Sequence, residues 1–172
     1  MKKIAFDDPY TRKTFQPITV NDVSKCSLDI VALIDIDNPE VHLSYIENLK
    51  NGFAFDEKKF IMTELKKKYS SYKSQDKLKS KFDSEQHISF DELIDKLYDS
   101  QLKCYYCMRN LKLVSNKKLD KSCWSLERLD NNLGHYGTNT CISCVGCNLQ
   151  RRTDNYEYFK MSKQLKVMKK KE

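Results

Sequence analysis

Two short cysteine pairs, Cys104-Tyr-Tyr-Cys107 and Cys144-Val-Gly-Cys147, decide the fold that the sequence predicts. Two residues between the cysteines of a pair allow both sulfur atoms to face a single ion, and zinc prefers four tetrahedral ligands such as thiolates. Four protein ligands fill the coordination sphere, so such a site is structural and not catalytic. We therefore expect one structural Zn²⁺ ion, held by Cys104, Cys107, Cys144 and Cys147.

The chain between the two pairs is too long for a simple zinc ribbon, because 36 residues separate them and about 15–20 are usual. Trp124-Ser-Leu-Glu-Arg-Leu129 alternates apolar and polar residues, which predicts a half-buried strand. Asp130-Asn-Asn-Leu-Gly134 favours a turn. A second strand can return over residues 138–145, and a helix is expected from Cys147 onward. The predicted order is strand, loop, strand and helix, and the zinc site is expected to hold both ends of this segment together.

Several residues of this stretch resemble the HNH (ββα-metal) endonuclease motif. They are Leu126-Glu-Arg-Leu-Asp-Asn131, Gly134-His135, Asn139, Cys144-x-x-Cys147-Asn148 and Arg151-Arg152. Cysteine knuckles surround such a motif in phage recombination endonuclease VII and in many phage and large-virus HNH proteins. The resemblance covers about residues 100–155. It implies an α+β fold in which a mainly helical region of unknown role, residues 1–86, precedes a zinc-bound HNH module with a basic C-terminal helix, residues 87–172.

The resemblance implies divalent-metal-dependent hydrolysis of DNA phosphodiester bonds. Glu127-Arg128 matches the strand-end pair that supplies a metal ligand and then the general base. Glu127 is therefore expected to bind the catalytic Mg²⁺ (or Mn²⁺), which prefers oxygen ligands. Asn148 matches the second metal ligand of the family. Asn139 matches the central asparagine, which is similar to those that brace the loop.

The departure from the family pattern is Arg128, which stands where the basic histidine usually lies. Arginine stays protonated in proteins and cannot accept a proton from water, so we expect Arg128 to stabilise charge on the phosphate instead. Two residues of the hairpin, Asp130 and His135, are candidate substitutes for the base. We favour His135, because imidazole titrates near neutral pH and its loop could swing toward the metal. A purely structural role for His135 stays open.

Charge is distributed unevenly along the chain. Residues 101–172 contain 15 Lys and Arg against 6 Asp and Glu, whereas residues 1–100 contain 16 against 18. A basic half predicts a polyanionic partner, here DNA. Arg151 and Arg152, one turn into the helix after Asn148, are expected to contact backbone phosphates. The lysine-rich stretch Tyr156–Glu172 predicts a final helix.

The other elements are expected to be helical. Residues 41–49 predict a short helix closed by Asn51-Gly52, and residues 56–72 follow helical spacing. The polar residues 73–86 are the candidate linker. Ser89-Phe-Asp-Glu92 fits a capping box at the start of the next helix, with an exposed His87 just before it.

The remaining cysteines, Cys26, Cys123 and Cys141, are expected to be free buried thiols, because seven cysteines are an odd number and six cluster within residues 104–147. No long apolar run is present at the start or elsewhere, so we expect an intracellular protein with no membrane partner.

Three functions fit these observations. The first is a magnesium-dependent HNH endonuclease, with branched or nicked DNA as candidate substrates. The second is a catalytically weak or inactive zinc-stabilised DNA-binding module. The third is a zinc-knuckle adaptor for protein interactions, which the lysine-rich charge and Asn148 directly after the last cysteine disfavour. Residues 1–86 could select a DNA structure, form a homodimer or recruit a partner, and nothing in their pattern chooses.

Overall fold

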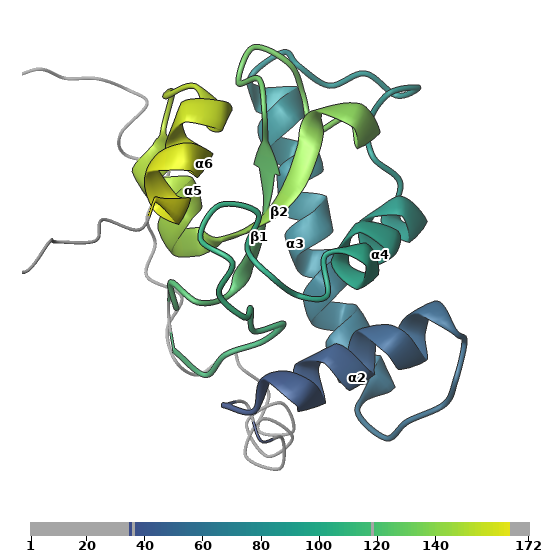
Figure 1. Ribbon diagram of the computed structural model, residues 1–172. Coiled ribbons are helices and arrows are strands. Elements are labelled where there is room, and N and C mark those ends of the chain that lie inside the picture. Colours follow the sequence, from purple (N-terminus) through teal and green to yellow (C-terminus); the bar gives the residue numbers. More distant parts are fainter. Residues whose placement is uncertain (1–34, 36, 118, 166–172) are drawn as a thin grey trace, which may run out of the picture.

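The computed structural model describes residue 35, residues 37–117 and residues 119–165. These residues form an α+β fold with five α-helices and one two-stranded antiparallel sheet (Figure 1). The sheet is a hairpin of β1 (Trp124–Arg128) and β2 (Thr140–Cys144), and α5 (Val145–Arg151) follows β2 directly. The predicted order of strand, loop, strand and helix is therefore confirmed.

The first described helix, α2 (Pro39–Lys50), confirms the short helix predicted over residues 41–49. Asn38 caps it, since its side-chain oxygen accepts a hydrogen bond from the backbone N–H of Glu40 at 3.0 Å. Proline suits the first helical position, where its missing N–H costs no intrahelical bond. The chain leaves the helix through Asn51 and Gly52, and Gly52 has a φ of 75°, which glycine adopts without steric cost.

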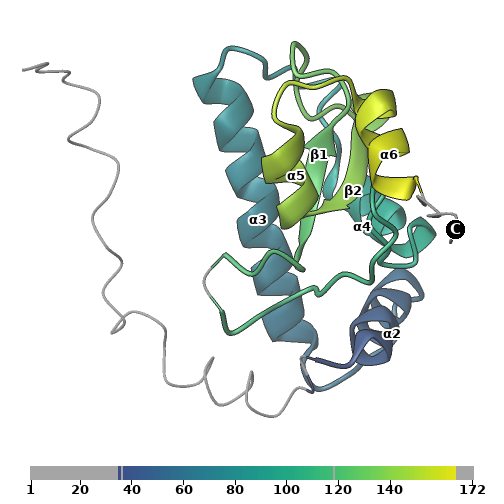
Figure 2. The same cartoon turned by 60° about the vertical axis from the view of Figure 1, so that its left-hand side comes forward.

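The long helix α3 (Lys58–Leu78) extends further than its sequence pattern predicts. Its buried residues continue at helical spacing through Tyr72 to Asp76. The linker predicted over residues 73–86 is therefore wrong over its first six residues, because a buried carboxylate there continues the buried stripe of the helix. In Figure 1 α3 lies behind the hairpin, and Figure 2 shows it running alongside the two strands.

The capping box predicted before α4 (Phe90–Asp99) is confirmed. Ser89 Oγ accepts a hydrogen bond from the backbone N–H of Glu92 at 3.1 Å. The Glu92 carboxylate in turn accepts one from the backbone N–H of Ser89 at 2.7 Å. Both bonds satisfy amide groups that a helix start leaves without intrahelical partners. The helix buries Leu93, Ile94 and Leu97 and packs against α2 and β2.

The hairpin is anchored in the core at one end and pairs in register along its length. Trp124 lies opposite Cys144, and Arg128 lies opposite Thr140. The Trp124 side chain is fully buried and donates a hydrogen bond to the Leu113 carbonyl at 3.1 Å. Trp124 therefore anchors the hairpin in the core.

The last described helix, α6 (Tyr156–Gln164), is shorter than the helix predicted over residues 156–172. It ends because Leu165 is extended; residues 166–172, like Cys26, lie outside the described residues. Phe159 packs edge-on against Tyr106 with ring centroids 5.0 Å apart. Tyr158 is 75% exposed, because it lies on the outer face of α6. None of the helices in the described residues combines the length and apolar character needed to cross a lipid bilayer.

Candidate functional site

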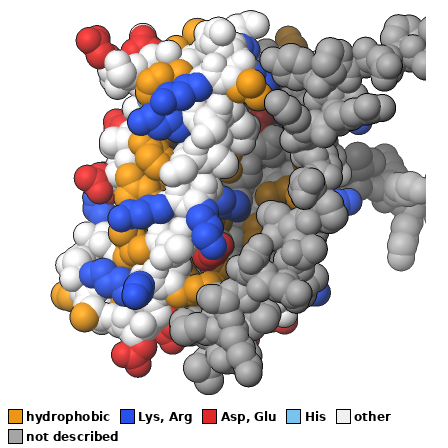
Figure 3. All heavy atoms as spheres, turned by 180° about the vertical axis from the view of Figure 1, so that it is seen from behind, with side chains coloured by type: hydrophobic (Ala, Val, Ile, Leu, Met, Phe, Trp, Pro, Cys, Tyr) orange, Lys and Arg blue, Asp and Glu red, His pale blue; other side chains and the backbone are white. Residues whose placement is uncertain are grey.

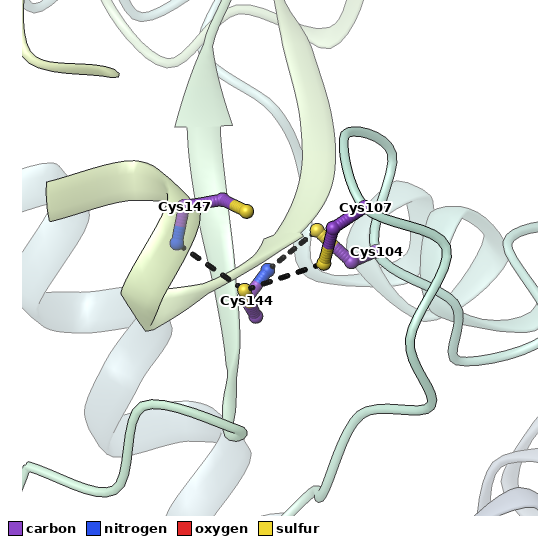
Figure 4. A group of neighbouring side chains, drawn as sticks. All are labelled: Cys104, Cys107, Cys144 and Cys147. Atoms are coloured by element: carbon purple, nitrogen blue, oxygen red, sulfur yellow. Dashed lines mark hydrogen bonds between the residues drawn. The ribbon is translucent and has the colours of Figure 1, made fainter. Parts of the chain in front are cut away.

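The four predicted zinc ligands meet at one point, although they come from two distant segments (Figure 4). Their sulfur atoms all lie within 4.8 Å of one another, and Cys107 Sγ and Cys144 Sγ are 4.0 Å apart. Tetrahedral zinc with Zn–S bonds of about 2.3 Å has S···S edges of about 3.8 Å. The cluster therefore has the ligand set and dimensions to hold a structural metal such as zinc.

The backbone around the cluster supports the sulfur atoms. The N–H of Cys144 donates to Cys104 Sγ and the N–H of Cys147 donates to Cys144 Sγ, both at 3.2 Å. In addition, the N–H of Tyr105 donates to the Ile142 carbonyl at 2.9 Å, which ties the first knuckle to β2.

The protonation of the cluster depends on a bound cation. A hydrogen bond with Cys144, followed by burial, raises the pKa of Cys104 to about 12. Burial is the main cause that raises the pKa of Cys147 to about 12. Metal binding requires thiolates, so an ion entering the cluster must displace protons and supplies the charge that keeps the sulfurs ionised.

Beside the hairpin lies a cavity of about 390 Å³, here called the polar cavity, at the far end of α5 from the cysteine cluster. Most of the residues that the sequence predicts for the site line it. Its charged side chains and its histidine are Lys79, Lys81, Glu127, Arg128, His135 and Arg152, and amide side chains come from Gln75, Asn131 and Asn148. Four cations therefore surround one carboxylate, an arrangement that favours an anion such as phosphate.

Glu127 is buried, and its charge is balanced by Arg151. The side chain of Glu127 is 5% exposed, and its Oε1 accepts a hydrogen bond from Arg151 Nε at 2.6 Å. Burial raises the pKa of Glu127 above its usual value, and the Arg151 guanidinium offsets part of that rise. Glu127 Oε2 has no hydrogen-bond partner among the described residues.

The predicted phosphate contact at Arg151 is contradicted by its position. Arg151 is 1% exposed. Its guanidinium is fully used by acceptors at the end of the hairpin and of α5, which are Glu127 Oε1, Asn131 Oδ1 and the carbonyls of Arg128, Leu129 and Asp154. A guanidinium has five N–H donors, so none is left for a phosphate. Arg151 is a structural residue that ties α5 to the loop after β1.

Asn148 lies one turn before Arg151 on the same face of α5. Its Nδ2 donates to Ser125 Oγ at 2.7 Å, which orients the amide. Its Oδ1 has no hydrogen-bond partner among the described residues, and Asn148 lines the polar cavity together with Glu127. Among the described residues, Glu127 from β1 and Asn148 from α5 therefore each bring to the cavity lining an acceptor oxygen without a hydrogen-bond partner.

Asn139 braces the loop between the strands, as the resemblance predicts. Its Oδ1 accepts from the backbone N–H of Asp130 at 2.9 Å. Its Nδ2 donates to the carbonyls of Asp130 at 2.9 Å and Gly134 at 3.0 Å. Asp130 itself is exposed and is not among the residues that line the polar cavity, so the structure does not bring this candidate base to the site.

His135 lines the polar cavity but lies in a rigid setting. It is 3% exposed, and the expected swing of its loop is contradicted because Asp76 holds both its backbone and its ring. A side chain on Gly134 would not fit, since a Cβ there would lie 2.3 Å from the Lys81 carbonyl. Burial is the main cause that lowers the pKa of His135 to about 4. The imidazole is therefore neutral at physiological pH.

His87 was expected to be exposed but belongs to the same buried group. Its side chain is 4% exposed, and its ring lies 5.2 Å from that of Phe82 and 5.8 Å from that of Tyr69. The segment around it pairs with the loop that contains His135, through a bridge between His87 and Tyr136. This pairing draws His87 inward.

The cations of the cavity come from both halves of the chain. Arg152 is exposed and lines the cavity, as expected of a phosphate contact, and its φ of 52° is strained for a residue other than glycine. Asn131 holds this conformation by donating to the Arg152 carbonyl at 2.6 Å. Lys79 and Lys81 follow α3. Figure 3 views the molecule from behind Figure 1 and shows several Lys and Arg side chains on that face.

Asp76, Lys79 and Lys81 all lie in the stretch predicted to be a linker, so the sequence did not indicate a role for them in the site. The one available signal was the spacing of four residues between Tyr72 and Asp76, which places both on one helix face. Cys123 and Cys141 are half-buried free thiols outside the cluster.

Comparison of the chain with protein-family models, with curated proteins and with solved structures found no match.

Proposed function

We propose that this protein is a divalent-metal-dependent endonuclease of the HNH type, which hydrolyses DNA phosphodiester bonds in the polar cavity. The observation that carries the proposal is the convergence of Glu127, Arg128, His135 and Asn148 on one cavity. The HNH resemblance indicates these residues from the sequence pattern alone, and the further cations that line the same cavity are independent support for a phosphate ligand.

The donor set of the cavity suits a hard cation. Glu127 Oε2 and Asn148 Oδ1 are oxygen atoms without hydrogen-bond partners among the described residues, and Mg²⁺ and Mn²⁺ prefer oxygen ligands. Bound there, Mg²⁺ would supply Lewis-acid stabilisation of charge on the phosphate and the leaving oxygen.

The chain's own residues account for the rest of the reaction. His135 is neutral, so it can take the proton of an attacking water as a general base. Arg128 donates through Nη1 to the Leu133 carbonyl at 3.2 Å, which steadies a guanidinium that lines the cavity. Its remaining donors suit the phosphate oxygens. Arg152, Lys79 and Lys81 attract the DNA backbone.

A second candidate is a zinc-stabilised DNA-binding module with weak or no cleavage. The ion pair between Arg151 and Glu127 supports this second candidate. The Arg151 guanidinium already neutralises the Glu127 carboxylate, which weakens its attraction for a catalytic metal ion. Arg128 in the position of the family's base supports it too. In this case the cations of the cavity bind phosphates without chemistry.

A cleavage assay with matched variants tests the proposal. Zinc-loaded protein is incubated with supercoiled plasmid and with branched DNA, in Mg²⁺, Mn²⁺ or EDTA. We expect metal-dependent nicking that falls at least about 100-fold in Glu127→Gln and in Asn148→Ala. Asn132→Ala is the control for Asn148→Ala, since Asn132 is exposed and lies outside the cavity. Circular dichroism verifies that each variant is folded.

The outcomes separate the two candidates. Nicking that survives both Glu127→Gln and Asn148→Ala would remove the assigned site. DNA binding without cleavage under every metal condition would favour the binding module. A folded protein that neither binds nor cleaves DNA would contradict both candidate functions.

A further inference from the structure

We propose that Asp76, near the end of α3, is a positioning residue that holds His135 in the tautomer required of the general base. This inference rests on the proposed function, because it specifies how the base of that site is prepared. It also makes α3, which lies outside the stretch that resembles HNH proteins, part of the reacting site.

The carboxylate of Asp76 contacts His135 twice. Asp76 Oδ1 lies 2.8 Å from the ring Nδ1 of His135, and Asp76 Oδ2 accepts a hydrogen bond from the backbone N–H of His135 at 2.6 Å. Asp76 is fully buried. With the Asp76 oxygen as the acceptor of this contact, Nδ1 carries the proton of the neutral ring. Nε2 then keeps its lone pair.

The lone pair faces no competing donor. Nε2 of His135 has no hydrogen-bond partner among the described residues, and His135 lines the polar cavity. A ring nitrogen that lacks a proton and borders a cavity can accept one from water in that cavity. In the opposite tautomer Nε2 would be a donor and could not act as a base.

The other groups around His135 keep it in place. Tyr72 from α3 places its ring 4.9 Å from the imidazole. His87 Nδ1 lies 3.0 Å from the His135 carbonyl and 3.6 Å from Asp76 Oδ2. The backbone N–H of Ile88 also donates to that carbonyl at 2.9 Å. Arg128 from β1 is a further charged neighbour and acts against protonation of the ring.

Asparagine at position 76 distinguishes positioning from a purely structural role. It keeps the shape of aspartate, and its oxygen can still accept from the backbone of His135. Its amide nitrogen would donate to Nδ1, which moves the ring proton to Nε2. A purely structural contact would survive this exchange, whereas a base prepared by Asp76 would not.

The test combines ¹⁵N NMR of the histidine ring with nicking kinetics on the zinc-loaded full chain. The His135 signals are assigned by their loss in His135→Gln. We expect the Nδ1–H tautomer in the wild type and the Nε2–H tautomer in Asp76→Asn. The nicking kcat should fall about 10²–10⁴-fold in Asp76→Asn with little change in KM. Asp91→Asn, at an exposed carboxylate in the first turn of α4, should behave as the wild type.

Failure of the inference and failure of the proposed function are distinguishable. A wild-type ring with its proton on Nε2 overturns the inference whatever the activity, and this measurement does not depend on the folding of Asp76→Asn. Nicking by Asp76→Asn at the wild-type rate also overturns it. A wild-type protein that cleaves no DNA while His135 has the Nδ1–H tautomer contradicts the nuclease and leaves Asp76 supported as the residue that sets the ring.

Discussion

The cysteine cluster and the polar cavity lie at opposite ends of α5, yet they are assembled in different ways. The cluster uses only residues 104–147, and two tight knuckles supply all of its ligands. The polar cavity is lined by side chains from α3, the following loop, β1, the hairpin loop and α5. One site is therefore encoded by short spacings, and the other depends on how distant segments pack.

This difference predicts how each site responds to damage. Two residues between paired cysteines set the positions of the two sulfur atoms within each knuckle. The cavity instead depends on buried hydrogen bonds of Asp76 with His135 and of Arg151 with Glu127. These bonds form only when the segments that carry the partners pack together. The cluster should thus act as a support for the cavity, while the cavity can fail without loss of the cluster.

The largest effect is expected from loss of the cluster. In Cys144→Ser, or after chelation of the metal, the end of β2 and the start of α5 lose their anchor. Metal binding at a structural zinc site contributes about 10 kcal/mol or more to folding, which exceeds the stability of many small domains. We expect loss of cooperative thermal unfolding, measured by circular dichroism, and about one zinc per wild-type chain by elemental analysis.

Cys123→Ser is the matched control, since Cys123 lies outside the cluster. It should keep the zinc content of the wild type. Equal zinc loss from both variants, or cooperative unfolding of the metal-free chain, would show that the cluster does not support the fold.

A smaller effect is expected from Arg151→Ala, which damages the cavity and spares the cluster. It leaves Glu127 buried without its partner, and breaking a buried ion pair in this way costs about 3–5 kcal/mol. Zinc content should stay at that of the wild type. Urea unfolding of Arg151→Ala and Arg152→Ala provides the comparison, because the exposed Arg152 should cost about 0.5 kcal/mol or less. Equal losses from the two variants would contradict the buried role of Arg151.

The smallest effect concerns pH. Between pH 6.5 and about 4 the unfolded chain binds a proton at residue 135 while the folded chain does not, because burial lowers the pKa of His135 to about 4. The free energy of unfolding should therefore fall as the pH falls through this range, by about 3 kcal/mol from this residue. Urea unfolding of His135→Gln should show a shallower pH dependence than the wild type. The same slope in both proteins would mean that His135 is accessible in the folded state.

Local signals in the sequence predicted much of the fold. The capping box at Ser89 and Glu92, the Asn51-Gly52 helix end and the alternating strand at Trp124 each depend on neighbours within a few residues. The predicted linker was wrong over residues 73–78, because polar residues on an exposed stretch of helix resemble a loop in sequence.

The sequence by itself determined the four-cysteine cluster, because each ligand pair is held by its own short knuckle. It also named Glu127, His135 and Asn148. Only the tertiary structure decided what surrounds them. Asp76 meets His135 across 59 positions of sequence, and Arg151 turned from an expected surface contact into the buried partner of Glu127. Such hydrogen bonds form only after α3 and α5 pack on the hairpin. Burial then strengthens each bond to a carboxylate or guanidinium, because the local dielectric constant is low.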